Sequence, residues 1–582
     1  MTFSPRQLLP GSLAAESLVM PDQSMTAPFH DPAAPGLRPS GQVLACRTFV
    51  LVLPLCFTVA LVAVWVGRFT MDGRLAVAEA VVAGLSGFAF FWMVLSVATA
   101  ILGLCWRRPS TVRPLHELKV AILLPMYGEP AAETIGNAVQ LLAGVGGRGR
   151  HSFSLHVLSD TRSSAAALIE EAVVAACRLR HRGLSLTYRC RAKNTDYKSG
   201  NIRDWVISEG HAHDAMLILD ADSIMGPDTV ILMADAMARK PGLGLIQTIP
   251  RILPGKTVWQ GLQSFASEVY GMNMGRGFAM WTGNEGNFLG HNALVRTRAF
   301  AASAGLPHLP GVAPRGGVIL SHDFVEAALM RRAGWGVQMM PEAEESHEDT
   351  PETLIGYLRR DQRWCQGNLQ HVRLLLVPGM HPLSRFHLLQ GVMAYLSSVW
   401  WLLLLLLWAL SGQGGTAIVA TPLLADWSLT PQIPQTTIAG VVVAMLVAPK
   451  LLGIIAHLRG NGLPIAAVPR FAGLVTAELL VSALLAPALM VHQVRAVLRI
   501  VRGGDGGWMP HATGRSDLRT LLRFHAVETG LGVVLLSLSL AGKISPWLLP
   551  ISVSLCLTIP LAALVQMPLS AFKQRQAGEK TA

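Results

Sequence analysis

Several stretches of this sequence are too long and too apolar to be the interior of a soluble domain. Charged residues are almost absent from residues 49–66, 77–104, 388–410, 436–455, 524–541 and 547–565. A helix needs about 20 consecutive apolar residues to cross the hydrocarbon core of a bilayer. Hydrophobic residues make up 51% of the chain and charged residues only 14%, which is typical of a membrane protein. We therefore predict a multi-pass α-helical membrane protein.

Basic residues predict the orientation of these segments. Arg107 and Arg108 follow the second segment directly, and flanks rich in Lys and Arg stay on the cytoplasmic side. The next domain is therefore expected in the cytoplasm, and the two spans before it return the N-terminus there as well. The formal charge of +12 has the same origin, since no basic run with interleaved aromatic residues indicates nucleic acid as a partner.

The ends of the chain and one ambiguous segment complete the membrane prediction. Residues 1–45 are rich in Pro, Ser and Ala and are expected to form a disordered cytoplasmic tail, and residues 571–582 a second tail. Residues 470–499 are apolar but contain Glu478 and Pro487. If they crossed the membrane, the basic loop after them would lie outside. We favour an interfacial or re-entrant helix pair, giving about six spans with both termini cytoplasmic, and a seventh span is the alternative.

Between the second and third apolar segments, residues 115–380 have the composition of an α/β domain. Apolar runs at 120–125, 153–158, 184–189 and 215–219 predict strands, and 134–145 and 164–180 predict helices between them. This alternation is typical of a mostly parallel sheet covered on both faces. The glycine motifs of dinucleotide-binding and P-loop proteins follow none of these strands, which argues against both classes.

The fourth predicted strand runs directly into Asp220 and Asp222, which are separated by one alanine. Ligands of open α/β sheets bind at the carboxyl ends of the strands. Side chains two residues apart leave a strand on the same side. A pair of carboxylates suits Mg²⁺ or Mn²⁺, which keep positions open for substrate phosphates. The alternative is an ordinary polar loop.

Other polar residues stand where a transferase would need them. They are Asp160 at the end of the second strand, Lys198 beside a glycine, His322 and Asp323 at the start of a helix, and Arg363 with Trp364. A lysine and an arginine suit a diphosphate, and an indole face suits a sugar ring. Three of these features have a structural alternative. Asp160 would cap a helix with Ser163, Asp323 would be a first-turn helix acid, and Arg363 with Trp364 would anchor the chain at the membrane surface.

Taken in order, these residues resemble the processive family 2 glycosyltransferases. The family signature is Asp, Asp-x-Asp, Asp and Gln-x-x-Arg-Trp, which Asp160, Asp220 with Asp222, Asp323, and Arg363 with Trp364 match in turn. The sequences KSGN at 198–201 and GHNA at 290–293 are similar to its Lys-x-Gly-Asn and acceptor-side Gly-x-Asn-Ala motifs. Arg360 replaces the glutamine of the signature, and Ser321, His322 and Asp323 replace the Thr-Glu-Asp of cellulose synthases.

Within that group, the sequence most resembles the glucans biosynthesis glucosyltransferase H family. The similar stretches are PMYGEP at 125–130, TGNEGNFLGH at 282–291 and RWCQGN at 363–368. The resemblance implies a GT-A-type domain, a UDP-glucose donor and the β-linked, typically β-1,2, backbone of osmoregulated periplasmic glucans. It further implies an inner-membrane location, membrane lipid and a growing glucan chain as partners, and contacts with acyl carrier protein and a periplasmic glucan-processing protein.

The chemistry and the resemblance together assign roles. Asp323 is the expected general base, and Asp160, Lys198, Asp220 and Arg363 are expected to bind the donor. Trp364 and Asn292 are expected on the acceptor side, and Asp220 and Asp222 are the expected ligands of Mg²⁺ or Mn²⁺. A single in-line displacement inverts the anomeric carbon, so that an α-linked donor yields a β-linkage. His322 either tunes Asp323 or caps the helix.

Three questions stay open in the sequence. The glycine-rich residues 502–510, within a loop at 500–523, are either a gate whose Trp508 reaches the donor site or a plain linker. The product is either a periplasmic glucan or another polymer, such as cellulose or an N-acetylglucosamine chain. A sugar-binding transporter or sensor is the alternative from a different class, but a pure binder has no need for Asp323.

Overall fold

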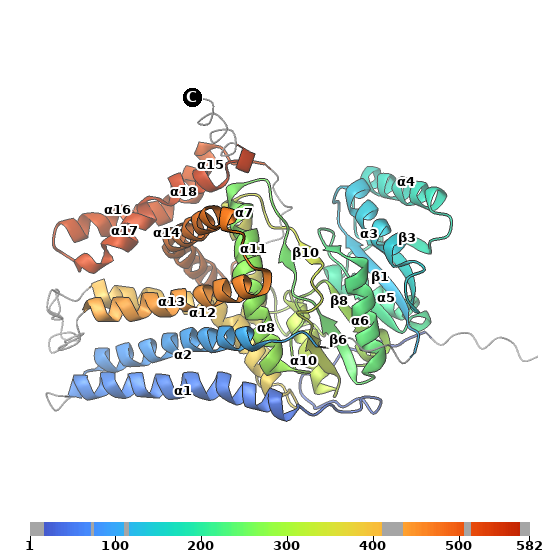
Figure 1. The fold of residues 1–582 in the computed structure, drawn as a ribbon, viewed down its shortest axis with the longest axis horizontal. Coiled ribbons are helices and arrows are strands. Elements are labelled where there is room, and N and C mark those ends of the chain that lie inside the picture. Colours follow the sequence, from blue (N-terminus) through green and yellow to red (C-terminus); the bar gives the residue numbers. More distant parts are fainter. Residues whose placement is uncertain (1–16, 71–74, 110–115, 410–434, 506–513, 571–582) are drawn as a thin grey trace, which may run out of the picture.

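The computed structural model describes residues 17–70, 75–109, 116–409, 435–505 and 514–570, and Figure 1 shows an α/β domain beside a group of long helices. The sheet of that domain has the strand order β3-β2-β1-β4-β8-β6-β9. Strand β8 runs antiparallel to β4 and β6, while the other pairs are parallel, which confirms the mostly parallel sheet. The strands are β1 (Lys119–Met126), β2 (Ser152–Ser159), β3 (Leu186–Cys190), β4 (Ala215–Ile218), β6 (Leu243–Gln247), β8 (Ala293–Arg296) and β9 (Gly336–Met339).

Alternate residues of β1 enter two separate cores, as the period of a strand requires. Ile122 packs toward the face covered by α3 (Ala131–Val145), α4 (Ser164–Arg180) and α6 (Pro227–Arg239). Leu123 packs toward the face covered by α5 (Tyr197–Ser208), α9 (Thr297–Ser303) and α10 (His322–Arg332). A smaller sheet has the order β5-β10-β7, from Ile224–Met225, Ser346–Glu348 and Arg251–Ile252. Both faces of the main sheet are therefore covered, and ligands can reach only its edge and strand ends.

The described residues contain five helices long and apolar enough to cross a membrane, or up to seven if each of two bent pairs is one span. The α/β domain contacts them through α8 (Met272–Thr282), which packs on α2, and through α11 (Leu354–Gln370), which packs on α12 and α14. The long helices are α1 (Gly41–Phe69), α2 (Val77–Cys105), α12 (Pro382–Ala409), α13 (Gln435–Asn461) and α14 (Val468–Val501). The bent pairs join α15 (Leu518–Phe524) to α16 (Ala526–Leu540), and η6 (Pro546–Leu548) with α17 (Leu549–Cys556) to α18 (Thr558–Val565).

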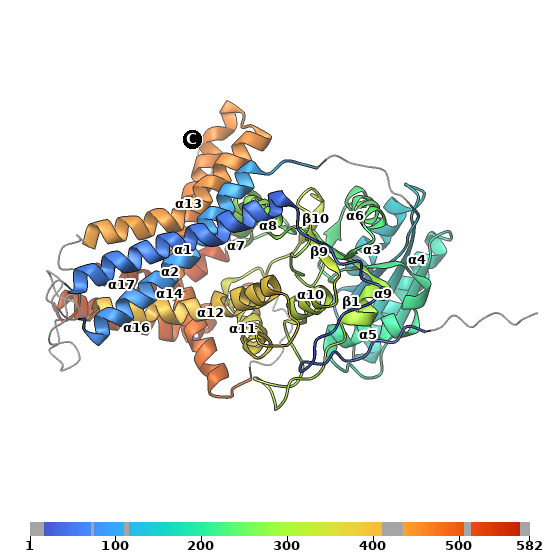
Figure 2. The same cartoon turned by 90° about the horizontal axis from the view of Figure 1, so that it is seen from below.

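Helix α14 corrects the expectation of a helix pair over residues 470–499, because it is one continuous helix with Pro487 inside it. In Figures 1 and 2 it runs across the direction of α1, α2 and α12. Its Glu478 accepts hydrogen bonds from Lys450 of α13 at 2.7 and 2.9 Å. A paired carboxylate can lie among apolar helices at a much lower cost than a lone one. The number of spans stays a prediction.

The N-terminal region corrects a second expectation. Residues 17–40, which we call the N-terminal strap, are not a disordered tail but lie against the α/β domain and lead into α1. Met20 is 5% exposed and Ala34 is 8% exposed within the core that also contains Leu123. Prolines leave the strap extended, and its carbonyl groups bond to arginine side chains of the domain. Residues 1–16 and 571–582, where tails were also expected, lie outside the described residues.

Candidate active site

Asp220 and Asp222 lie just beyond β4, at the strand end where the sequence placed them. A tight turn shapes this segment, because the Asp220 N–H donates to Ser223 Oγ at 2.9 Å. The Lys198 ammonium comes from the first turn of α5 and is hydrogen-bonded to the Asp220 carboxylate. It also donates to the carbonyl oxygen of Gly290 at 2.7 Å. Residues far apart in the chain, Lys198, Asp220 and the Gly290 loop, therefore meet at one point.

Asp323 lies at the same place, in the first turn of α10. A Cβ atom added to Gly290 would stand 3.4 Å from Asp323 Oδ2, so the base candidate packs directly against the Gly290 loop. Burial raises the pKa of Asp323, and the charge of His322 opposes this effect. Burial lowers the pKa of His322, but Glu326, whose Oε2 is 3.1 Å from its Nδ1, raises it above the ordinary value. His322 is thus an ion-paired residue beside Asp323.

The electrostatics of Asp220 and Asp222 fit a divalent cation. Burial raises the pKa of Asp222 to about 6, and the charge of Asp220 adds to this effect. Burial also acts on Asp220, but Lys198 and His291 outweigh it and hold the pKa of Asp220 below its ordinary value. Two carboxylates that disfavour each other's charge are stabilised by a cation placed between them. Within the described ranges no group of three or more His, Cys, Asp or Glu could hold a metal ion, so phosphate oxygens would complete the coordination.

His291 and Glu348 add a charge pair that the sequence reasoning did not assign. His291 Nε2 lies 3.2 Å from Glu348 Oε2. Burial lowers the pKa of His291, but the bond to Glu348 and the charge of Asp220 raise it to about 9. His291 belongs to the GHNA sequence at 290–293, and this position between two recognised residues was the available signal. Its positive charge lies next to the paired aspartates.

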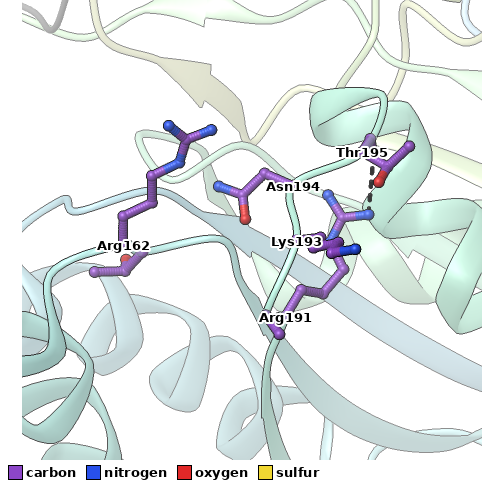
Figure 3. A pocket seen from close by; sticks show the side chains of 7 residues that line it. Arg162, Arg191, Lys193, Asn194 and Thr195 are labelled. Atoms are coloured by element: carbon purple, nitrogen blue, oxygen red, sulfur yellow. Dashed lines mark hydrogen bonds between the residues drawn. The ribbon is translucent and has the colours of Figure 1, made fainter.

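Asp160 directly follows the last residue of β2, as expected, and its carboxylate is bound by Arg191. The guanidinium of Arg191 lies 2.7 Å from Oδ1 and 2.8 Å from Oδ2 of Asp160. Ser159 pairs with Cys190 at the end of β2 and β3, so the residues that follow them, Asp160 and Arg191, come to lie side by side. Only the register of the two strands could have revealed this contact. Beside the pair opens a pocket of about 570 Å³, where Figure 3 shows Arg162 opposite Lys193 and Asn194. The pocket is lined by Thr161, Arg162, Arg191, Ala192, Lys193, Asn194 and Thr195.

The acceptor-side candidates occupy different environments. Trp364 on α11 is 45% exposed, and the guanidinium of Arg360 stacks on its ring at 4.6 Å from the centroid. Arg360, the departure from the family signature, therefore supports the indole face. Arg363 is half-buried next to it, and burial, with the charge of Arg360, lowers the pKa of Arg363. Asn292 is fully buried and donates to Ser346 Oγ and to the His347 carbonyl, so it braces the loop here, and its contact with an acceptor stays a prediction.

Helix α11 also fixes the loop in front of Asp323, which the sequence did not indicate. Gln370 Oε1 accepts a hydrogen bond from the Leu320 N–H at 3.0 Å, and Gln370 Nε2 donates to the Val318 carbonyl at 3.1 Å. His371, the residue directly after α11, has its Nε2 3.1 Å from the carbonyl oxygen of Ser321. The helix that presents Trp364 therefore also holds the start of α10. Trp508 lies outside the described residues, and its role as a gate stays a prediction.

Comparisons with known proteins agree on one family. Residues 215–448 match the family described as glycosyl transferase family group 2. The glucans biosynthesis glucosyltransferase H of Caulobacter vibrioides is 40% identical over 518 residues, covering 84% of this chain and 77% of that protein. The enzyme of the same name from Vibrio cholerae is 37% identical over 548 residues, covering 90% and 76%. The chain belongs to the glucans biosynthesis glucosyltransferase H family.

This membership makes the protein a glycosyltransferase and confirms the expected fold class, a GT-A-type α/β domain joined to apolar helices that could span a membrane. It removes the sugar-binding transporter or sensor as an alternative. Among solved structures, a mannosyltransferase from Pyrobaculum calidifontis in complex with GDP-Man and Mn²⁺ is 14% identical. Its TM-score is 0.41, over 66% of this chain and 99% of that one.

Proposed function

We propose that this glucosyltransferase H family member builds the β-1,2-linked backbone of a periplasmic glucan from UDP-glucose. The observation that carries the proposal is the convergence of Lys198, Asp220 and Asp323 on the Gly290 loop. A cation for phosphate, a metal-binding carboxylate and a base are then within reach of one sugar. The pocket beside Asp160 is the proposed place of the nucleoside part of the donor.

Each side chain has a definite task in the proposed reaction. Asp323 accepts the proton of the acceptor hydroxyl as that oxygen attacks the anomeric carbon. Lys198 and Arg363 offset the charge that develops on the leaving diphosphate. Asp220 and Asp222 would hold a Mg²⁺ ion, which supplies further neutralisation of the diphosphate. Trp364 stacks on a sugar of the growing chain, and the displacement inverts the anomeric centre without a covalent intermediate.

The membrane part of the proposal concerns location and export. The apolar helices and the arginines after α2 support an inner-membrane protein whose α/β domain faces the cytoplasm. The product would pass outward through its own spans. Contacts with acyl carrier protein and a periplasmic glucan-processing protein stay predictions from the family resemblance.

Membrane vesicles containing the protein, incubated with labelled UDP-glucose and Mg²⁺, test the proposal. A labelled β-1,2 glucan that is absent from vesicles without the protein is the expected product. A polymer of another linkage would show that the protein makes a different product. Incorporation from other nucleotide sugars but not from UDP-glucose would overturn the donor assignment.

The activity should fall at acidic pH, and the midpoint of this fall should lie above the pKa of an ordinary carboxyl group. Asp323 must be deprotonated to accept a proton, and burial raises its pKa above the usual value of about 4. As the pH falls through that raised pKa, kcat/KM should decline, because this ratio reports the free enzyme. The His322→Gln variant loses the charge that lowers the pKa of Asp323, so its acid limb should move to still higher pH. An unshifted limb would contradict this pairing.

A further inference from the structure

The N-terminal strap crosses the face of the domain that α5, α9 and α10 cover. Its Gln23 N–H donates to the Gly305 carbonyl just beyond α9, at 2.9 Å, and its Asp31 N–H donates to the Ala333 carbonyl just beyond α10, at 3.0 Å. Asp31 Oδ2 also accepts a hydrogen bond from the indole N–H of Trp335 at 2.9 Å. Backbone and side chain bonds together fix the strap along its length, so it is part of the folded domain.

The surface of the domain is shaped to receive the strap. A Cβ atom at Gly305 would collide with the carbonyl group of Pro21. At Gly334, where φ is +103°, a Cβ atom would stand 2.8 Å from His30 Cε1. The first glycine allows a close approach that a side chain would block, and the second also supplies a backbone conformation that L-residues rarely adopt. These glycines lie far from the strap in sequence, yet each fits it.

Two arginines bind one short part of the strap from two different helices. Arg203 on α5 pairs with Asp22 at 2.6 Å and donates to the Met20 carbonyl at 2.9 Å. Arg332 at the end of α10 donates to the Ser24 carbonyl at 2.7 Å and to Gln23 Oε1 at 3.1 Å. Arg332 is 6% exposed, so displacement of the strap would leave a buried guanidinium without these hydrogen-bond acceptors. Residues 20–24 thus join α5 to α10.

The same two helices begin with the residues of the proposed reaction. Lys198 lies in the first turn of α5 and Asp323 in the first turn of α10. A short helix moves as a rigid body, so a contact further along it, at Arg203 of α5 or Arg332 of α10, also restrains its first turn. We infer that the N-terminal strap sets the distance between Lys198 and Asp323, with Arg203 and Arg332 as positioning residues. This inference rests on the proposed function, in which Lys198 meets the diphosphate and Asp323 the acceptor.

The expected effect is on the chemical step rather than on donor binding. A misplacement of about 1 Å between reacting groups can slow a reaction roughly a hundred-fold. The bond between Lys198 and Asp220 does not involve the strap, so we expect the donor-binding residues to stay together when the strap is displaced. Releasing the strap should therefore lower kcat and leave the KM for the donor nearly unchanged.

Two variants of residues that hold the strap, and one control, test this in the full-length, membrane-embedded protein. Gly305→Val blocks the approach of Pro21, and Arg332→Gln removes the charged clamp. Arg298→Gln is the control, because Arg298 is exposed on the neighbouring α9. We expect faster amide hydrogen exchange over residues 17–40 and a kcat lower by roughly ten- to a hundred-fold in both variants, with KM for UDP-glucose within about two-fold of wild type. The control should match wild type.

The other outcomes separate the possible failures. Faster exchange with an unchanged kcat would overturn the inference, and so would unchanged exchange, because the glycine and arginine contacts would then not hold the strap. Equal losses in kcat and in donor affinity would indicate a general structural role and also count against it. A wild-type protein that transfers no glucose from UDP-glucose would overturn the proposed function itself, whatever the variants do.

Discussion

The Asp323→Asn variant should lose glucan synthesis by a factor of about 10² to 10⁴, the usual contribution of a general base. Asparagine has nearly the same shape, but it cannot take the proton of the acceptor hydroxyl. The protein should fold as before, because Asp323 is enclosed and its charged form is costly there, as the raised pKa indicates. Initial rates with labelled UDP-glucose and the thermal unfolding midpoint, measured on the same preparation, check both statements.

A matched control separates catalysis from helix stability. Asp228 is also an acid in the first turn of a helix, α6, but it is exposed and pairs with Arg148 at 3.1 Å. If Asp323 were only a helix acid, both substitutions to Asn would have the same small effect, below about 1 kcal/mol. Full activity of Asp323→Asn, with Asp228→Asn equally active, would mean that the base is another residue.

The Asp222→Asn variant should lose activity by about a thousand-fold, because a bound cation contributes several kcal/mol to stabilising the leaving group. The half-saturating Mg²⁺ concentration should rise as well, since one carboxylate ligand is lost. Donor turnover measured against Mg²⁺ concentration checks this, with Asp228→Asn as the control of equal chemistry.

A change of ligand gives a sharper version of the same experiment. Thiolates prefer softer cations than carboxylates do. The Asp222→Cys variant should therefore be inactive with Mg²⁺ and regain part of its activity with Cd²⁺, while the wild type should prefer Mg²⁺. An unaltered response to Mg²⁺ in both Asp222 variants would remove Asp222 from the metal site.

The sequence predicted the elements whose signals are local. The apolar run 215–219 without polar alternation indicated a buried strand, and β4 lies there with Asp220 and Asp222 at its end. The alternation of strands and helices likewise gave the sheet and its first four strands. Such features depend on residues next to each other in the chain, which is why composition and spacing were enough.

What the sequence did not reveal depends on contacts between distant segments. The Asp160–Arg191 pair needs the register of β2 against β3. The strap has the composition of a disordered tail, and its order comes from Gly305, Arg203 and Arg332 far along the chain. Composition alone therefore cannot distinguish a free tail from one that a folded surface is built to bind.

The same limit applied to the long apolar helices. Helix α14 continues through Pro487, because a proline bends a helix without always ending it when neighbouring helices support the turn. Its one acidic residue, Glu478, is tolerated through its bond to Lys450 of another helix. A prediction from one segment at a time had no access to that partner.

The bonds of Lys198 have a consequence for the order in which ligands enter. Its ammonium is shared between the Asp220 carboxylate and the Gly290 carbonyl. The proposed reaction assigns the first partner to a cation and the ammonium to a diphosphate, so each arrival releases a group that the other ligand needs. By thermodynamic linkage, the cation should tighten donor binding by the same factor as the donor tightens cation binding. The cation and the donor would then bind cooperatively.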